Sequence, residues 1–176
     1  LNVERRKYRF RLLNGGPSRV YAFGLSDNSA INQISSDGNL LPNPVVRGVP
    51  GAIPDLNDFI VIGVAERMDV IIDFSKYGPN TRLYLVNWAE QINGAGPTGK
   101  IPKVSTPVVQ FRVGNLPLIP DVSKIPATMR TLPTVDLSGP PVARPWKFER
   151  ANGGWVINGQ IFDANVDRAS VLRGSR

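Results

Sequence analysis

The residue types that most often carry catalysis or bind transition metals are missing from this sequence. Its 176 residues include no histidine and no cysteine. Histidine is the commonest general base and, with cysteine, a main ligand for zinc, copper and non-haem iron. A Ser–His or Cys–His nucleophile pair is therefore impossible. Carboxylates, lysine, tyrosine and amides remain, and these could bind calcium or magnesium at most. We predict no catalytic, cofactor-binding or metal-binding residue in this chain.

Two carboxylates flank an apolar run and could suggest an acid–base pair. Asp69 and Asp73 are four residues apart, so on a strand both point to one face, roughly 13 Å apart. Glycosidase pairs are only about 5–9.5 Å apart, so we do not predict such a pair. The neighbouring Glu66 and Arg67 are better interpreted as a buried or half-buried ion pair that holds a turn.

Two further features have a chemical and a structural interpretation. Residues 36–42, which include Asp37 and Gly38, could be mistaken for part of a calcium-binding loop. The segment lacks the alternating acidic ligands and the terminal glutamate of such loops. It predicts a tight turn with glycine at positive φ. The tryptophans could form a platform that stacks on sugars, yet we favour anchors in a core or an interface. These tryptophans are Trp88, Trp146 and Trp155.

The chain is basic, with 21 lysines and arginines against 14 acidic residues and a net charge of +7. Such a balance allows binding to nucleic acid or anionic surfaces. Only residues 5–11 form a basic cluster, and there the cations alternate with Tyr8, Phe10 and Leu12. Alternation with apolar residues predicts the solvated face of a strand, which we favour over a nucleic-acid site. No apolar run reaches the roughly 18 residues of a membrane span.

The elements that would position these side chains are short strands with period-two alternation. Turn signals recur about every ten residues, which is typical of an all-β sandwich or barrel. Residues 65–68 could add one helical turn, and residues 91–107, rich in glycine and proline, predict a long surface loop. The expected strands are 7–12, 20–25, 31–34, 59–64, 69–74, 82–88 and 108–113, with 59–64 buried on both faces.

The composition changes after residue 113. Residues 114–145 include Pro117, Pro120 and five further prolines of the chain's 16, so we predict an extended connector laid over a surface. Strand-like alternation restarts at 146–149 and 155–157, around the turn at 152–154. This tail is too short to bury a core of its own, so we expect it to pack on the first domain or on another chain.

An ordered series of segments resembles one known family. Residues 146–154 and 157–159 look most like the entry to the third domain of bilirubin oxidases. The preceding part resembles the second cupredoxin-like domain of multicopper oxidases, in the branch of bilirubin oxidases and bacterial spore-coat laccases. The segments that carry this second resemblance are 6–15, 33–41, 65–74 and 109–113.

The resemblance implies an all-β, cupredoxin-like Greek-key sandwich or barrel at 1–113. It is followed by a proline-rich interdomain linker at 114–145 and the beginning of a truncated third domain at 146–176. Family members hold a type 1 copper in the third domain and a trinuclear copper cluster between the first and third domains. The second domain carries no copper ligand, and this sequence without histidine or cysteine agrees with that pattern.

The resemblance further implies a non-catalytic middle segment of an oxidoreductase that couples one-electron oxidation of phenolic, tetrapyrrole or metal donors to reduction of O2 to water. Copper would be bound in the parent enzyme and not by this segment. The expected partners are the first and third cupredoxin domains of the same oxidase, in an extracellular, periplasmic or coat-associated setting, with no nucleic acid and no membrane span. The missing initial methionine indicates a processed or proteolysed product.

The alternative is a free-standing β-sandwich module that binds polyanions or glycans. It would use the basic strand 5–11 and exposed tryptophans.

Overall fold

The computed structural model describes residues 1–94, 96–134 and 143–170. The chain divides into two compact units, Leu1–Leu132 and Pro133–Arg176. Nearly all regular structure in the described residues is β-strand, and the one helical element there is the 3₁₀ turn η1 (Leu56–Asp58). The all-β class expected from period-two alternation is confirmed.

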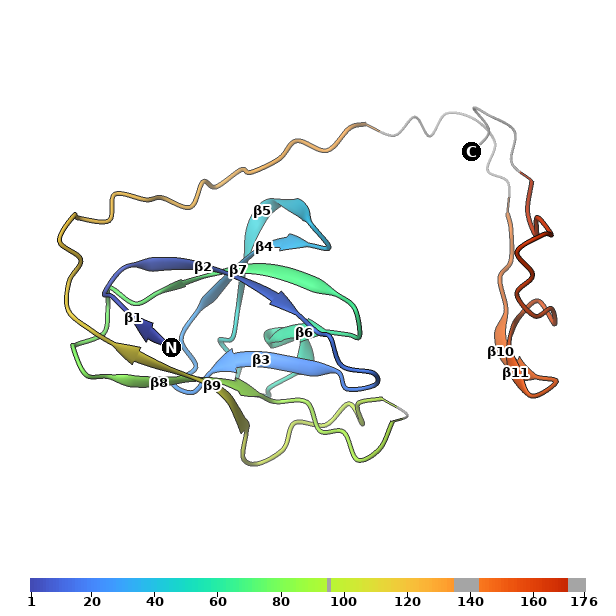
Figure 1. Cartoon of the computed structure of the whole chain (residues 1–176), viewed down its shortest axis with the longest axis horizontal. Coiled ribbons are helices and arrows are strands. Elements are labelled where there is room, and N and C mark those ends of the chain that lie inside the picture. The colour runs from blue at the N-terminus through green and yellow to red at the C-terminus, as the bar shows by residue number, and fades with distance from the viewer. Residues whose placement is uncertain (95, 135–142, 171–176) are drawn as a thin grey trace. The chain divides into compact units, whose positions relative to one another are not determined.

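The first unit is a sandwich of two β-sheets (Figure 1). All strand pairs in it are antiparallel except the short parallel pair of β1 with β9. The five-stranded sheet contains, in spatial order, β1 (Asn2–Val3), β9 (Thr106–Val113), β8 (Arg82–Asn87), β3 (Tyr21–Leu25) and β6 (Ile60–Ile62). The four-stranded sheet contains β2 (Lys7–Leu13), β7 (Arg67–Asp73), β4 (Ile31–Ser36) and β5 (Asn39–Arg47).

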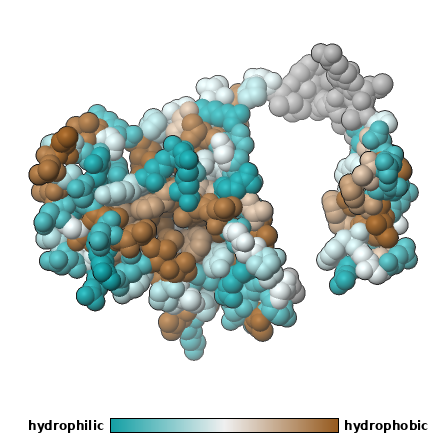
Figure 2. All heavy atoms as spheres, in the orientation of Figure 1, coloured by the Kyte–Doolittle hydropathy of each residue, from teal (hydrophilic) through white to brown (hydrophobic). Residues whose placement is uncertain are grey.

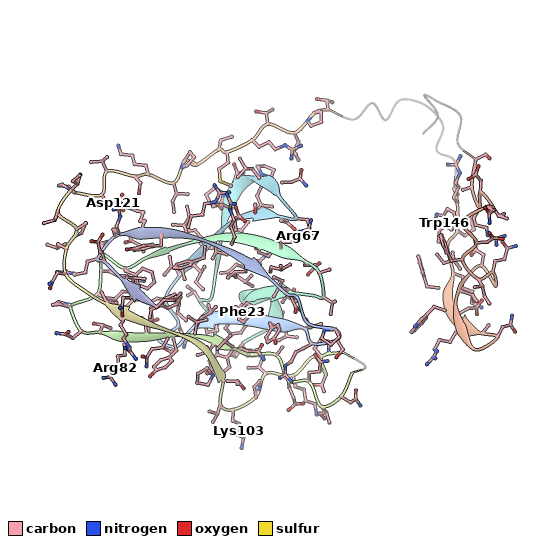
Figure 3. The ribbon with its side chains drawn as sticks, in the orientation of Figure 1. Phe23, Arg67, Arg82, Lys103, Asp121 and Trp146 are labelled. Carbon is pink, nitrogen blue, oxygen red and sulfur yellow. The ribbon has the colours of Figure 1, made fainter. Side chains whose placement is uncertain are left out.

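The main core lies between the two sheets, because each strand turns every second side chain inward. Phe23 lies in this layer (Figure 3), and the rings of Phe10, Phe74 and Phe111 contact one another there at centroid distances of 5.1–6.3 Å. Burying each large apolar side chain contributes about 1.5–3 kcal/mol. The largest fully buried side chains are Phe74, Leu25, Ile31, Ile60, Ile62, Ile72, Val70, Val86 and Val113.

A smaller apolar cluster involves the opposite face of β3. Ala22, Phe59 and Ala89 form its buried centre. The Phe59 ring stacks on Trp88 at 5.7 Å and lies so close to Gly24 that a Cβ added there would sit 2.9 Å from the ring. Gly24 therefore allows the stacked pair to lie against the β3 backbone.

Every strand expected in the first unit is present, but two strands were missed. β1 is only two residues long, and β5 contains Pro42 and Pro44, a residue type that disfavours the interior of a sheet. Because β5 is an edge strand, proline costs it no ladder hydrogen bond on its open side. β6, expected to be buried on both faces, is an edge strand whose Val61 is half-buried.

Residues 65–68 do not form the helical turn that the sequence analysis allowed. Ala65 has a positive φ of 64°, and β7 has already begun at Arg67. The expected tight turn after β4 is confirmed: Asp37 (φ 47°) and Gly38 (φ 82°) both adopt left-handed backbone. Such a pair of residues matches the right-handed twist of a two-residue hairpin.

The second unit contains one antiparallel hairpin, β10 (Phe148–Ala151) with β11 (Gly154–Ile157). Asn152 and Gly153 form its turn, both at positive φ, as the Asn-Gly-Gly signal indicates. In the described parts of the connector, residues 114–134 and 143–147, no strand or helix is present. Proline density there explains the absence of regular hydrogen bonding.

Candidate functional surfaces

The two carboxylates of β7 are held in ion pairs with the neighbouring strand β2. Asp69 is 9% exposed and accepts hydrogen bonds from the Nε (2.9 Å) and Nη2 of Arg9. The Arg11 Nε lies 4.0 Å from the same carboxylate. Asp73 lies 4.0 Å from the Lys7 ammonium. Both carboxylates neutralise the basic strand, which fits the structural interpretation better than an acid–base pair.

The predicted Glu66–Arg67 ion pair is wrong. The Glu66 carboxylate accepts the backbone N–H of Gly63, and Arg67 lies 3.6 Å from Asp37. Adjacent residues at the start of a strand point to opposite faces, so they cannot meet. Asp37, the partner of Arg67, lies in the turn between β4 and β5. No local sequence pattern predicts this contact.

The tryptophans have different environments. Trp88 packs on Phe59 in the first unit, which confirms it as an anchor of an apolar cluster. Trp146 and Trp155 belong to the second unit and are 45% and 73% exposed. The Arg150 guanidinium lies 5.5 Å from the centre of the Trp155 ring.

The second unit has an open apolar groove of 490 Å³. Figure 2 shows apolar atoms, in brown, gathered on this unit. Phe148 and Phe162 are 72% and 86% exposed, and Val156 is the buried apolar residue of the unit's described part. Soluble proteins rarely expose a contiguous apolar patch of this kind unless it is an interface. The groove is lined by Trp146, Phe148, Trp155, Val156, Ile157, Asn158, Gln160, Ile161, Phe162 and Arg168.

Residues 115–130, which we call the strap, run along the first unit from one edge of the four-stranded sheet to the other. The Lys7 N–H of edge strand β2 donates to Asp121 Oδ2 at 2.9 Å, and the Met129 N–H donates to the Pro42 carbonyl of edge strand β5 at 2.7 Å (Figures 1 and 3). Hydrogen bonds from the Ser123 side chain and the Lys7 N–H hold the pKa of the Asp121 carboxyl far below its usual range. The expectation of a connector laid over a surface is confirmed for this stretch.

Hydrogen bonds of Asp27 connect the turn after β3 with the loop after β7. Asp27 Oδ2 accepts hydrogen bonds from the Ser29 hydroxyl at 2.6 Å and the Tyr77 hydroxyl at 2.8 Å. Burial alone would raise the pKa of Asp27, but these hydrogen bonds outweigh it and lower the pKa. Burial and the Asp27 carboxylate raise the pKa of Tyr77 to about 12.

The donor set of this chain does not fit copper. Copper sites are built from imidazole and thiolate groups, and the sequence has neither. The described residues also contain no group of three or more acidic side chains that could hold another metal ion. Within the same residues, no helix has the length and apolar character needed to cross a membrane.

Several known proteins similar to this chain are named bilirubin oxidase or laccase. No family model matches it. The bilirubin oxidase of Albifimbria verrucaria is 32% identical over 169 residues, which is 92% of this chain and 27% of that protein. The laccase of Bacillus subtilis (strain 168) is 35% identical over 136 residues, or 77% of this chain and 23% of that protein.

Solved structures agree on the fold. The McoA multicopper oxidase of Aquifex aeolicus superposes with a TM-score of 0.68 at 24% identity, covering 91% of this chain and 32% of that one. The chain thus spans about a quarter to a third of the length of the proteins it matches. From these relatives and this superposition, the chain belongs to the multicopper oxidases, and its first unit has their cupredoxin-like fold.

Proposed function

We propose that this chain is the non-catalytic middle segment of a multicopper oxidase, and that its role is architectural. Two observations carry the proposal. A match at 32% identity covers 92% of this chain and 27% of a bilirubin oxidase, and the sequence has neither histidine nor cysteine. A segment with no imidazole or thiolate contributes to such an enzyme by holding other domains in place.

The proposed domain order is a second cupredoxin-like domain at 1–113, a linker at 114–145 and the start of a third domain at 146–176. The division into Leu1–Leu132 and Pro133–Arg176 supports two separately packed parts. The strap supports a refinement, because residues 115–130 contact the first unit through Asp121 and Met129.

The apolar groove of the second unit supports the third-domain assignment. A hairpin with Trp146, Phe148 and Trp155 on its surface cannot bury them against itself, since only Val156 is buried in its described part. Further strands of a cupredoxin-like domain would supply the missing apolar partner. The hairpin is then the first layer of that domain.

In the whole oxidase, electrons from phenolic, tetrapyrrole or metal donors would reach O2, which is reduced to water. Copper would be bound by the first and third domains, the partners of this segment. Relatives named bilirubin oxidase and laccase support the reaction class. The proposed location is extracellular, periplasmic or coat-associated.

The test is made in the full-length oxidase that carries this segment. The variants Trp146→Ala and Trp155→Ala are expected to lower its melting temperature and its copper content, because they remove the anchors of the third domain. Ile53→Ala is the matched control, since Ile53 is 91% exposed in the first unit. Unchanged stability and unchanged copper content in both tryptophan variants would count against the architectural role.

The alternative of a free-standing module for polyanions or glycans has less support. Arg9 and Arg11, two of the basic residues that it would use, already face the Asp69 carboxylate of β7. A salt-dependent retention of this chain on heparin, lost in Arg5→Glu and Arg9→Glu, would favour that alternative; we expect no such retention.

A further inference from the structure

The strap and the start of β2 enclose a small pocket of 250 Å³ that differs from the apolar groove in charge. β7 contributes Ile71 to it, and the strap contributes Ile125; both are half-buried. Around this apolar base, four of the lining residues are cationic and one is acidic. The lining consists of Arg6, Lys7, Tyr8, Arg9, Ile71, Asp121, Ser123, Lys124 and Ile125.

The carboxylate in the lining of this pocket, Asp121, accepts two backbone hydrogen bonds. Asp121 Oδ2 accepts the Lys7 N–H, and Oδ1 accepts the Ser123 N–H, both at 2.9 Å. Its pKa is strongly depressed by hydrogen bonds from Ser123 and Lys7, so it remains an anion that holds the strap in place. Its negative charge offsets only one of the four cations of the lining, so the pocket keeps a net positive charge.

The cations of the pocket are unequally paired. Arg9 is tightly bound by Asp69. Among the described residues, Arg6 and Lys7 have only long ion pairs, 3.9 Å to Glu4 and 4.0 Å to Asp73. Lys124 makes no hydrogen bond or ion pair within the described part of the chain. Three positive groups thus face one small cavity with spare hydrogen-bonding capacity.

We propose that this pocket binds a small oxyanion, held by Lys124 from the strap and by Lys7 and Arg6 from the β2 side. Charge-assisted hydrogen bonds from ammonium and guanidinium groups are the contacts that phosphate, sulfate and carboxylate ligands prefer. Because one ligand would bridge the strap and β2, binding stabilises the packed position of the strap. The inference is independent of the architectural role, since it concerns contacts within the first unit.

The experiment uses the 176-residue chain and inorganic phosphate as the probe. Thermal unfolding is followed at increasing phosphate and, separately, at chloride of equal ionic strength, which corrects for general screening. We expect a saturable rise of the melting temperature with phosphate beyond the chloride effect. Lys124→Gln is expected to weaken the apparent phosphate affinity about tenfold, the loss of one charge-assisted hydrogen bond.

Lys103→Gln is the matched control. It removes the same charge from an exposed side chain that points away from the first unit (Figure 3) and lines neither pocket of the strap. Its phosphate dependence should equal that of the wild type. Equal effects of phosphate and chloride, or equal losses in Lys124→Gln and Lys103→Gln, would overturn the proposal.

Two further measurements identify the chemical class of the anion that the pocket binds. Succinate at the same ionic strength tests a carboxylate, and amide chemical shifts of residues 6, 7, 123 and 124 report where each anion binds. Shifts with phosphate alone assign a free phosphate-type ligand, whereas equal shifts with succinate assign a carboxylate-type ligand. Shifts spread over the whole basic surface instead would contradict a defined site.

Discussion

At the residue scale, three carboxylates hold strands and loops of the first unit together. Asp69 binds Arg9 and faces Arg11, Asp27 binds Ser29 and Tyr77, and Asp121 binds the start of β2. Asp27 and Asp121 are poor candidates for proton transfer near neutral pH, because hydrogen bonds lower the pKa of both carboxyls. The network explains why a basic strand can lie in a sheet without repelling its own neighbours.

Asp69→Asn tests the value of the principal ion pair. Removing a mostly buried carboxylate leaves two arginines facing a neutral amide, and we expect a loss of about 1–3 kcal/mol in the free energy of unfolding. The control is Asp73→Asn, whose side chain is 37% exposed and has one ion pair at 4.0 Å. Its loss should stay below about 1 kcal/mol. Urea unfolding measures the free energy of unfolding of both variants. Equal losses would show that burial does not determine how much each ion pair stabilises the fold.

Tyr77 makes the stability of the chain depend on alkaline pH. Its folded-state pKa is raised from 10.0 to about 12, so the neutral hydroxyl is favoured in the folded state. The resulting stabilisation is fully present below pH 10 and is lost as pH rises from 10 to 12. Tyr77→Phe should flatten this part of the curve of melting temperature against pH. An identical slope in the variant would contradict the assignment.

At the scale of elements, the strap binds each edge strand of the four-stranded sheet at one point. β2 is bound by Asp121 and β5 by the Met129 N–H, both from the strap. Pro42 and Pro44 remove two donors from β5. An open edge strand can pair with strands of other chains. The contacts of the strap with β2 and β5 hinder such pairing.

Gly24→Ala tests the packing between β3 and the Phe59–Trp88 stack. The new methyl group would lie 2.9 Å from the Phe59 ring, which cannot move freely because it is 2% exposed. We expect a loss of about 1–3 kcal/mol, as in other overpacked cores. Gly51→Ala is the control, since nothing lies within 4 Å of the added Cβ. If both variants unfold at the same urea concentration, the close contact has no energetic cost.

At the scale of the molecule, the two units differ in how much apolar surface they bury. The first unit has a closed core between its sheets, whereas the second exposes most of its aromatic side chains. A unit with one buried apolar residue in its described part cannot offset the conformational entropy of folding by itself.

Truncation to residues 1–132 tests this difference. The shortened chain should keep a cooperative unfolding transition, because the core between its two sheets is intact. Its fluorescence with an apolar dye such as ANS should fall, since the groove around Trp155 is removed. Leu118→Ser in the whole chain is the control for a scattered exposed residue and should leave the signal unchanged. Undiminished dye binding after truncation would place the apolar surface in the first unit.

The sequence by itself determined the fold class, most of the strands and the chemistry that is impossible. Alternation such as that of Tyr8, Phe10 and Leu12 with Lys7, Arg9 and Arg11 is local and survives in the structure as β2. The absence of histidine and cysteine is a property of composition alone. Hairpin turns at Asp37–Gly38 and Asn152–Gly153 were likewise predictable, because they depend on the backbone preferences of those residues.

Only the tertiary structure decided which charges meet and which edges are covered. Arg67 pairs with Asp37, the Lys7 N–H donates to Asp121, which lies 114 positions away in the sequence, and β5 forms despite its prolines. The mixed-charge pocket under the strap depends on the same long-range placement. Contacts between distant segments depend on how the sheets and the strap pack, and no local pattern of residues encodes that packing.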